Sequence, residues 1–217
     1  WTSCAHCWTG AAIDAPFQAS WIRAWANLGS AAPDGLFERL MAAYRESHRS
    51  YHTLQHLGEC LALFSQAIDL AANPGAVELA LWFHDAVYAP RSGDNERRSA
   101  EWAVHELEAA GVSSEVRQRV FDLILATCHN AVPADPDAQL LVDIDLAILG
   151  TPPHRFAEYD RQVREEYRWV PGFLYRIKRK QVLNAFQARA EIFSTPYFRA
   201  RFEASARVNL RGAINAA

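Results

Sequence analysis

Long apolar runs are missing from this sequence. No stretch approaches the roughly 18 uncharged apolar residues that a membrane span needs, and the N-terminus lacks a basic segment followed by an apolar one. Both absences argue against a membrane protein and against secretion. We therefore expect a cytoplasmic protein with no membrane partner.

Cysteine is also scarce, with four residues in a chain of 217. Four scattered cysteines are too few for a disulfide framework in a chain of this length, so we expect reduced thiols. Cys4 and Cys7 have the CxxC spacing of a zinc site, but zinc takes four ligands and no second such pair follows nearby. We interpret residues 1–16 as an N-terminal extension, either disordered or derived from a tag.

Patterns typical of β-strands are nearly absent. Apolar residues recur at helical spacing almost throughout, which predicts an all-α fold of about eight to ten helices. No repeat, low-complexity segment or Gly- and Ser-rich linker divides the chain, so residues 17–217 are predicted to form one domain. Caps, Gly and Pro place the helices at residues 17–28, 34–46, 53–71, 74–86, 94–110, 114–128, 138–149, 152–169, 173–193 and from 196 onward.

The net charge of −3 conceals an asymmetry between the two parts of the chain. Residues 1–154 carry 9 Lys and Arg against 19 Asp and Glu, whereas residues 155–217 carry 13 against 6. The acidic part suits a cation and the basic part suits an anionic substrate, although helix faces could simply neutralise one another. The slightly acidic total and the lack of a recognition motif argue against nucleic acid as a partner.

Several histidines and aspartates interrupt this apolar scaffold. His52 and His56 are four residues apart, so on one helix both rings would project from the same face. His84 and Asp85 end a strongly apolar helix, where an unpaired carboxylate would cost several kcal/mol. A divalent cation would compensate that cost, and the alternative is a buried Arg or a set of helix amides.

A second acidic interruption lies in the apolar segment 140–149. Asp143 and Asp145 are two residues apart and therefore point roughly 200° away from each other on a helix. One can face a metal while the other pairs elsewhere. The combination of HxxxH, His-Asp and a later buried Asp is much more specific than any of its parts.

The order His56, His84-Asp85, Asp145 resembles the H, HD, D signature of the HD superfamily, in particular its predicted metal-dependent phosphohydrolases. The resemblance covers residues 17–212 and includes the segments 49–57, 83–88, 94–100 and 143–150. It implies an HD-type helical bundle in which His56, His84, Asp85 and Asp145 bind a divalent metal ion. Mn, Fe, Co, Ni, Zn and Mg are all admissible, and two His ligands favour a transition metal.

Residues 51–56 are also similar to the YHNxxH motif of cyclic-nucleotide phosphodiesterases, although Thr53 replaces the Asn. That similarity implies that His52 is a general acid, while Asp85 or Asp145 orients the attacking water. The register of the last motif favours Asp145 over Asp143 as the ligand.

Further residues could enlarge the site. Glu96, His129 and Asp143 are candidates for a second metal or for supporting contacts, and the alternative for His129 is a helix C-terminal imidazole stabilised by the helix dipole. Guanidinium groups match phosphate oxygens in bidentate geometry, so a basic face could clamp a substrate phosphate. Its members are Arg179, Lys180 and Arg189, and the alternative is a solvated face paired with nearby Glu residues.

The predicted function is hydrolysis of a phosphate ester or anhydride of a small molecule, such as a nucleotide. One alternative is an HD-type di-iron oxygenase, and another is a module that binds a nucleotide without turning it over. The substrate itself depends on loops and pocket shape, which the sequence does not reveal. Aromatic-rich exposed ends could support a homodimer.

Overall fold

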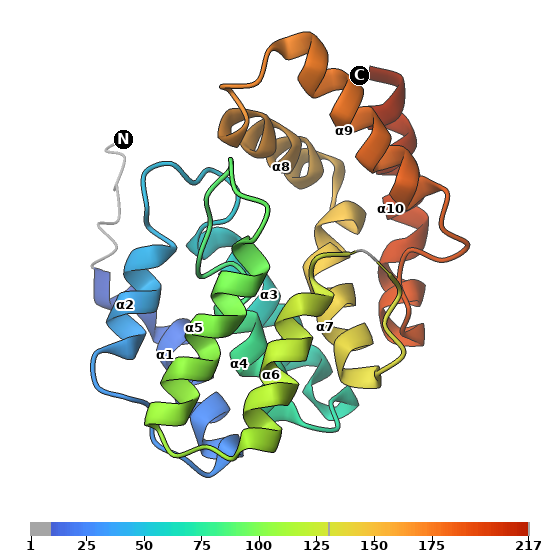
Figure 1. The fold of residues 1–217 in the computed structure, drawn as a ribbon. Helices are drawn as coiled ribbons and strands as arrows, with labels where there is room; N and C mark the ends of the chain where they lie inside the picture. The colour runs from blue at the N-terminus through green and yellow to red at the C-terminus, as the bar shows by residue number, and fades with distance from the viewer. Residues whose placement is uncertain (1–9, 130, 217) are drawn as a thin grey trace, which may run out of the picture.

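A computed structural model describes residues 10–129 and 131–216, and within these ranges it is a helical bundle without a strand (Figure 1). The prediction of an all-α fold with eight to ten helices is confirmed, because the described residues form ten α-helices and two short 3₁₀-helices. The bounds are α1 (Gly10–Leu28), α2 (Leu36–Ala43), α3 (Leu54–Ala67), η1 (Ile68–Leu70), α4 (Pro74–Phe83), α5 (Asn95–Ala109), α6 (Ser114–Ala126), α7 (Pro136–Leu146), η2 (Ala147–Gly150), α8 (Pro153–Glu166), α9 (Gly172–Gln187) and α10 (Pro196–Ala216).

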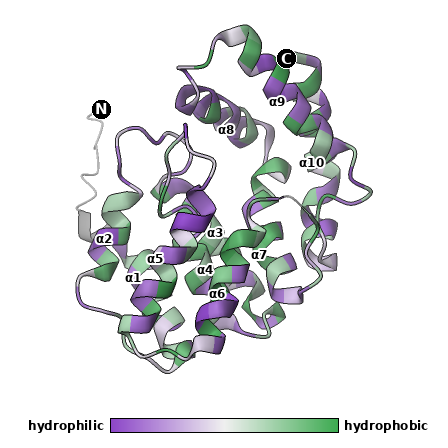
Figure 2. Cartoon of the chain, in the orientation of Figure 1, coloured by the Kyte–Doolittle hydropathy of each residue, from purple (hydrophilic) through white to green (hydrophobic). Residues whose placement is uncertain are grey.

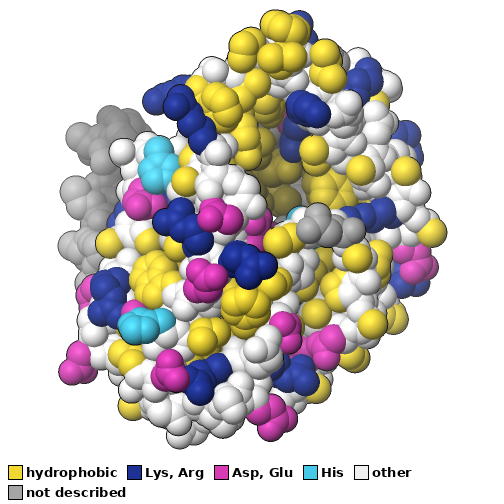
Figure 3. All heavy atoms as spheres, in the orientation of Figure 1, with side chains coloured by type: hydrophobic (Ala, Val, Ile, Leu, Met, Phe, Trp, Pro, Cys, Tyr) yellow, Lys and Arg dark blue, Asp and Glu magenta, His cyan; other side chains and the backbone are white. Residues whose placement is uncertain are grey.

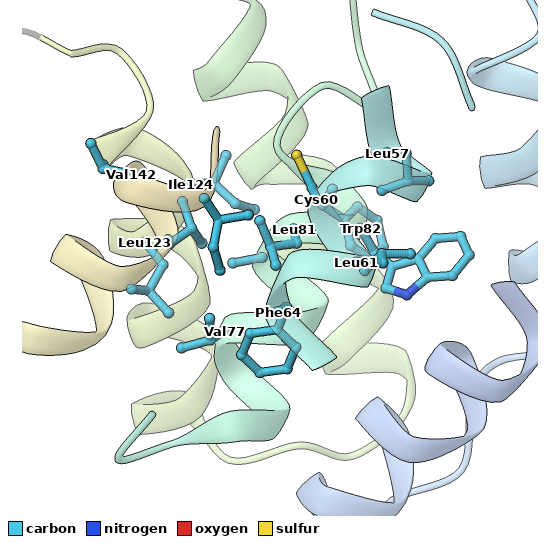
Figure 4. Close-up of a cluster of buried hydrophobic side chains, with 14 of the residues drawn as sticks. Leu57, Cys60, Leu61, Phe64, Val77, Leu81, Trp82, Leu123, Ile124 and Val142 are labelled. Atoms are coloured by element: carbon cyan, nitrogen blue, oxygen red, sulfur yellow. The ribbon is translucent and has the colours of Figure 1, made fainter. Parts of the chain in front are cut away.

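Helix α4 is the centre of the bundle. It packs against α1, α3, α5, α6 and α7, and nine of its ten residues are buried. Figure 4 shows Leu81 of α4 between side chains of α6 and α3, and Trp82 beside Leu57 and Leu61 of α3. Hydropathy follows the same arrangement, because α7 is mostly hydrophobic whereas α8, at the edge, is mostly hydrophilic (Figure 2).

Two glycines end helices where the sequence predicts them to do so. Gly29 follows α1 with φ of 66°, and Gly111 follows α5 with φ of 73°. This left-handed conformation terminates a helix at little cost only when no Cβ is present. The start of α1 was predicted too late, because the helix begins at Gly10 rather than at Phe17. Cys4 and Cys7 lie outside the described residues.

Helix α9 is shorter than predicted, since it ends at Gln187 and not at Phe193. The guanidinium group of Arg207 on α10 donates to the carbonyl oxygens of Gln187, Arg189 and Ala190. The side chain of Arg207 therefore satisfies carbonyls that a longer helix would have bonded to its own amides.

Helices α8 and α9 lie above the rest of the bundle, and α10 runs beside α9 back toward the top (Figure 1). Figure 3 shows a hollow, lined by hydrophobic side chains, between α8 and α9 above and the loops that precede α5 and α7 below. Within the described residues, no helix is both long enough and apolar enough to span a bilayer.

Candidate metal centre

Four potential ligand atoms from three helices converge in the interior. Nε2 of His56 lies 3.2 Å from Nε2 of His84 and 3.2 Å from Oδ1 of Asp145. Oδ2 of Asp85 lies 3.0 Å from Nε2 of His84 and 3.4 Å from Nε2 of His56. Atoms that share one metal ion with bonds of about 2.0–2.2 Å are separated by distances of this order.

Local folding brings these residues together. Thr53 caps α3 by accepting a hydrogen bond from the backbone N–H of Gln55, which places His56 in the first turn of α3. His84 caps the C-terminus of α4, so Asp85 follows at the point where the buried helix stops. Asp145 projects from the last turn of α7. Because all three helices pack against one another, the core fixes the positions of the ligands.

The hydrogen bonds of the two imidazole rings leave both Nε2 atoms facing the same point. His84 donates from Nδ1 to the carbonyl oxygen of Leu81 at 2.8 Å, so its neutral form carries a lone pair on Nε2. Nδ1 of His56 lies 3.0 Å from the hydroxyl of Tyr51. When His56 donates from Nδ1 to that hydroxyl, both Nε2 atoms carry lone pairs, and these repel each other at 3.2 Å unless a proton or a cation lies between them. The donor set therefore fits a metal ion, with each ring oriented through its other nitrogen.

The electrostatics also favour a cation. Burial disfavours a charged His84, but Asp85 and Asp145 outweigh this effect and raise the pKa of His84 to about 9. Burial likewise disfavours the two carboxylates, yet neighbouring imidazoles hold the pKa of each below its ordinary value. A cluster that binds a proton so tightly offers a strong negative potential to a metal ion.

Cys60 is a potential ligand that was not predicted from the sequence. His56, Cys60, His84 and Asp145 form a buried group whose ligand atoms all lie within 4.8 Å of one another, and this group could hold a metal ion. The sulfur lies 3.7 Å from Nδ1 and 3.8 Å from Nε2 of His56, almost equidistant from the two nitrogens. It is therefore beside the ring rather than in line with the Nε2 lone pair. Asp85, which is not a member of this group, has Oδ2 within 3.4 Å of Nε2 of both imidazoles.

The two aspartates of α7 have different partners. Asp145 faces the cluster, whereas the carboxylate of Asp143 accepts hydrogen bonds from the backbone N–H groups of Ser194 and Thr195 and from the Thr195 hydroxyl. Asp143 therefore lies at the N-terminus of α10 and not among the candidate ligands, which gives no support to the suggestion that it binds a second metal.

His52 lies beside the cluster and is held by Glu166. Nδ1 of His52 is 2.7 Å from the Glu166 carboxylate, and the His52 ring stacks on Tyr88 with centroids 4.1 Å apart. Glu166 also accepts from the backbone N–H groups of residues 50, 51 and 52 and from the Tyr88 hydroxyl. Burial favours the neutral form of Glu166, but His52 and these amides lower its pKa to about 2. Burial opposes charge on His52, yet Asp85 and Glu166 raise its pKa.

Glu166 was not predicted as a site residue. The sequence does contain a signal for it, because Glu166 lies on the same side of α8 as Phe156, Tyr159 and Val163. A carboxylate on the inner stripe of an amphipathic helix requires a buried partner. The identity of that partner, more than 110 residues away, could not be read from the pattern.

Arg49, which begins the segment 49–57, had no predicted role, but it joins two segments of the site. Its guanidinium group donates to the carbonyl oxygens of His52, Asp85 and Ala86, and its side chain is fully buried. The turn before α3 and the turn after α4 are thereby held together by one side chain. A planar fork with five donors suits this task better than an ammonium group does.

His129 is brought to the cluster. Its Nε2 lies 3.0 Å from Oδ2 of Asp145, the oxygen that is not directed at His56. Its Nδ1 is buried without a hydrogen-bond partner, and its φ of 55° is unusual for a residue with a side chain. Glu96 is half-buried in the first turn of α5, and its charge adds to burial in raising the pKa of Cys128.

The three predicted phosphate ligands lie in different surroundings. Arg189 donates to the carbonyl oxygen of His129, at the edge of the cluster. Arg179 is bound to Asp160 and Tyr159, whereas Lys180 is exposed. The structure therefore does not gather the three into one clamp, and Arg189 is the member nearest the candidate ligands.

Comparison with known proteins adds no functional evidence to the geometry of the site. No family model, curated protein or solved structure matches this chain. The buried His, Cys and Asp side chains that could hold a metal are thus the main basis for a functional interpretation.

Proposed function

We propose that this protein is a metal-dependent phosphohydrolase that cleaves a phosphate ester or anhydride of a small molecule, such as a nucleotide. The observation that carries the proposal is the convergence of Nε2 of His56, Nε2 of His84 and one oxygen each of Asp85 and Asp145. Two nitrogen and two oxygen donors suit a transition metal better than Mg.

A divalent ion in this centre would polarise a phosphoryl oxygen and lower the pKa of a coordinated water. Asp85, whose side chain is 17% exposed, is available to orient the attacking water. Glu166 holds Nδ1 of His52, so Nε2 is the nitrogen available to donate a proton to the leaving oxygen. Arg189, beside His129, would neutralise charge on the substrate.

A di-iron oxygenase is a second candidate because of one observation. The carboxylate of Asp145 lies between His56 and His129, with one oxygen directed at each ring, so these three residues could take part in holding two irons. Two iron atoms per chain together with oxygen consumption would favour this candidate over phosphate release.

The decisive experiment measures metal and activity in the same preparations. Wild type, His84→Ala and His105→Ala would be purified, their metal content determined by inductively coupled plasma mass spectrometry, and phosphate release measured with nucleotides, sugar phosphates and p-nitrophenyl phosphate in added Mn. His105 is exposed on α5 and serves as the matched control.

We expect wild type and His105→Ala to bind metal and release phosphate. In His84→Ala, the affinity for the metal and the rate of phosphate release should both fall roughly a hundredfold or more. Metal binding without turnover of any substrate would favour a nucleotide-binding module. A wild-type protein that neither binds added metal nor releases phosphate would refute the proposal.

A further inference from the structure

Helix α9 exposes a cluster of large apolar side chains at one end of the molecule. Trp169 just before the helix, and Phe173, Leu174 and Ile177 within it, are 47%, 58%, 44% and 53% exposed. We call these four residues the α9 patch. Positions 173, 174 and 177 share one side of a helix. Leu183 is the single fully buried residue of α9. Figure 3 shows hydrophobic side chains gathered at this upper end, with Lys and Arg beside them.

The patch lies in the most basic segment of the chain. Residues 167–190 contain six Lys and Arg and no Asp or Glu. Two of the six form ion pairs, Arg168 with Glu165 and Arg179 with Asp160, and Arg189 donates to the carbonyl oxygen of His129. Arg176, Lys178 and Lys180 are exposed around the patch. This combination of aromatic and aliphatic side chains bordered by cations is typical of a helix that lies in a membrane interface.

We propose that the α9 patch docks on the surface of an anionic phospholipid membrane. Trp, Phe, Leu and Ile would enter the boundary between headgroups and acyl chains, and the flanking cations would meet lipid phosphates. Helix α9 lies at an outer edge of the bundle, where it can meet a flat surface without obstruction from α1 to α7 (Figure 1). The docking is peripheral, so it needs no membrane-spanning helix, and it departs from the sequence-based expectation that no membrane is a partner. It does not depend on the proposed enzymatic function.

Two other occupants fit less well. In a symmetric dimer the same patch would face itself, so Arg176, Lys178 and Lys180 of the two copies would repel one another. Four side chains also provide much less than the ~800 Å² per partner of a stable interface. Nucleic acid would engage the cations but would leave Phe173, Leu174 and Ile177 in water.

The test is co-sedimentation of the full chain with vesicles of phosphatidylcholine alone and of phosphatidylcholine mixed equally with phosphatidylglycerol. We expect binding to the anionic vesicles only. The double variant Phe173→Ser/Ile177→Ser should bind about tenfold or more weakly, because two inserted apolar side chains are lost. Lys178→Gln/Lys180→Gln should also bind about tenfold more weakly at low salt, and its difference from wild type should shrink as salt is raised.

The matched control is Ile22→Ser/Val208→Ser, which removes two apolar side chains that are 69% and 59% exposed on α1 and α10. It should bind as wild type does. Far-ultraviolet circular dichroism and thermal unfolding would establish that every variant is folded. Equal binding by Phe173→Ser/Ile177→Ser and by its control, or no binding by wild type, would overturn the proposal. The proposal would also be overturned if light scattering showed a dimeric wild type and monomeric α9 variants while no protein bound vesicles.

Discussion

Helices α4 and α9 differ strongly in the fraction of their residues that is buried. Nine of the ten residues of α4 are buried, whereas one of the sixteen in α9 is buried. Helix α4 ends at Phe83, His84 caps it and Asp85 follows, so the buried core positions part of the candidate metal centre. Helix α9 is held mainly along one side and presents the other to its surroundings. The comparison indicates that site geometry depends on α4, whereas α9 can change its surface without disturbing the fold.

The largest expected effect comes from opening a cavity in α4. Trp82 is fully buried, and its indole N–H donates to the Ser20 hydroxyl. Trp82→Ala should lower the free energy of unfolding by about 3–5 kcal/mol and also reduce the metal content, because His84 lies two residues further on. Urea unfolding followed by circular dichroism measures the first effect. A loss below about 1 kcal/mol would show that the site does not depend on the packing of α4.

Glu166→Gln should be next in size. The pKa of Glu166 is lowered from an ordinary 4.5 to about 2, which corresponds to about 3 kcal/mol of stabilisation at neutral pH. Since the folded-state pKa is the lower one, this contribution is fully present above pH 4.5 and is lost as the pH falls toward 2. Unfolding free energies measured from pH 7 down to pH 2 should therefore converge for wild type and variant. A difference that stays constant with pH would contradict this account.

A smaller effect is expected at Gly150, at the end of η2. A Cβ there would lie 2.6 Å from both Cβ and the carbonyl oxygen of Phe202 on α10. Gly150→Ala should cost about 1–3 kcal/mol because α10 would have to move. The control is Gly212→Ala on the exposed side of α10, where a Cβ meets nothing within 4 Å. That control should be neutral or stabilising by up to about 1 kcal/mol in thermal unfolding, as expected when Ala replaces Gly in a helix.

The smallest effect should be found in α9. Ile177→Ser should change the free energy of unfolding by less than about 0.5 kcal/mol, since the side chain is already 53% exposed. Leu183→Ala, on the buried side of the same helix, should cost about 2 kcal/mol or more. Urea unfolding of the two variants compares the exposed and buried sides of α9 in their contribution to the free energy of unfolding. If both were equally destabilising, α9 would belong to the core and the contrast with α4 would disappear.

Helical periodicity and helix ends were predictable because they are encoded locally. The spacing of apolar residues located every α-helix, and Gly29 and Gly111 marked two of the ends. Local patterns do not predict a feature of the fold that depends on a side chain distant in sequence. The end of α9 depends on Arg207, which takes the last carbonyls, and Gly150 is needed for the approach of Phe202 rather than only for ending a helix.

The site shows the same division. Histidines and acids that interrupt apolar helices were visible in the sequence, and the structure brings His56, His84, Asp85 and Asp145 together. Their roles in catalysis stay predictions. Spacing on α7 predicted that Asp143 and Asp145 would diverge, but the partner of Asp143 on α10 could not be read from it. Arg49 and Glu166 act across long sequence separations, so nothing near them in the chain announced their contacts.

Glu166 has a consequence for the order of folding. It lies at the end of α8, more than 110 residues from the turn whose backbone it holds, so that turn acquires its final shape after most of the chain has collapsed. Contacts with such long sequence separation form late because loop closure must precede them. A nascent chain that has left the ribosome only as far as α7 would contain His56, His84, Asp85 and Asp145, yet His52 would still lack its carboxylate partner. The proton donor of the proposed reaction would thus be set in place only after α8 has been synthesised.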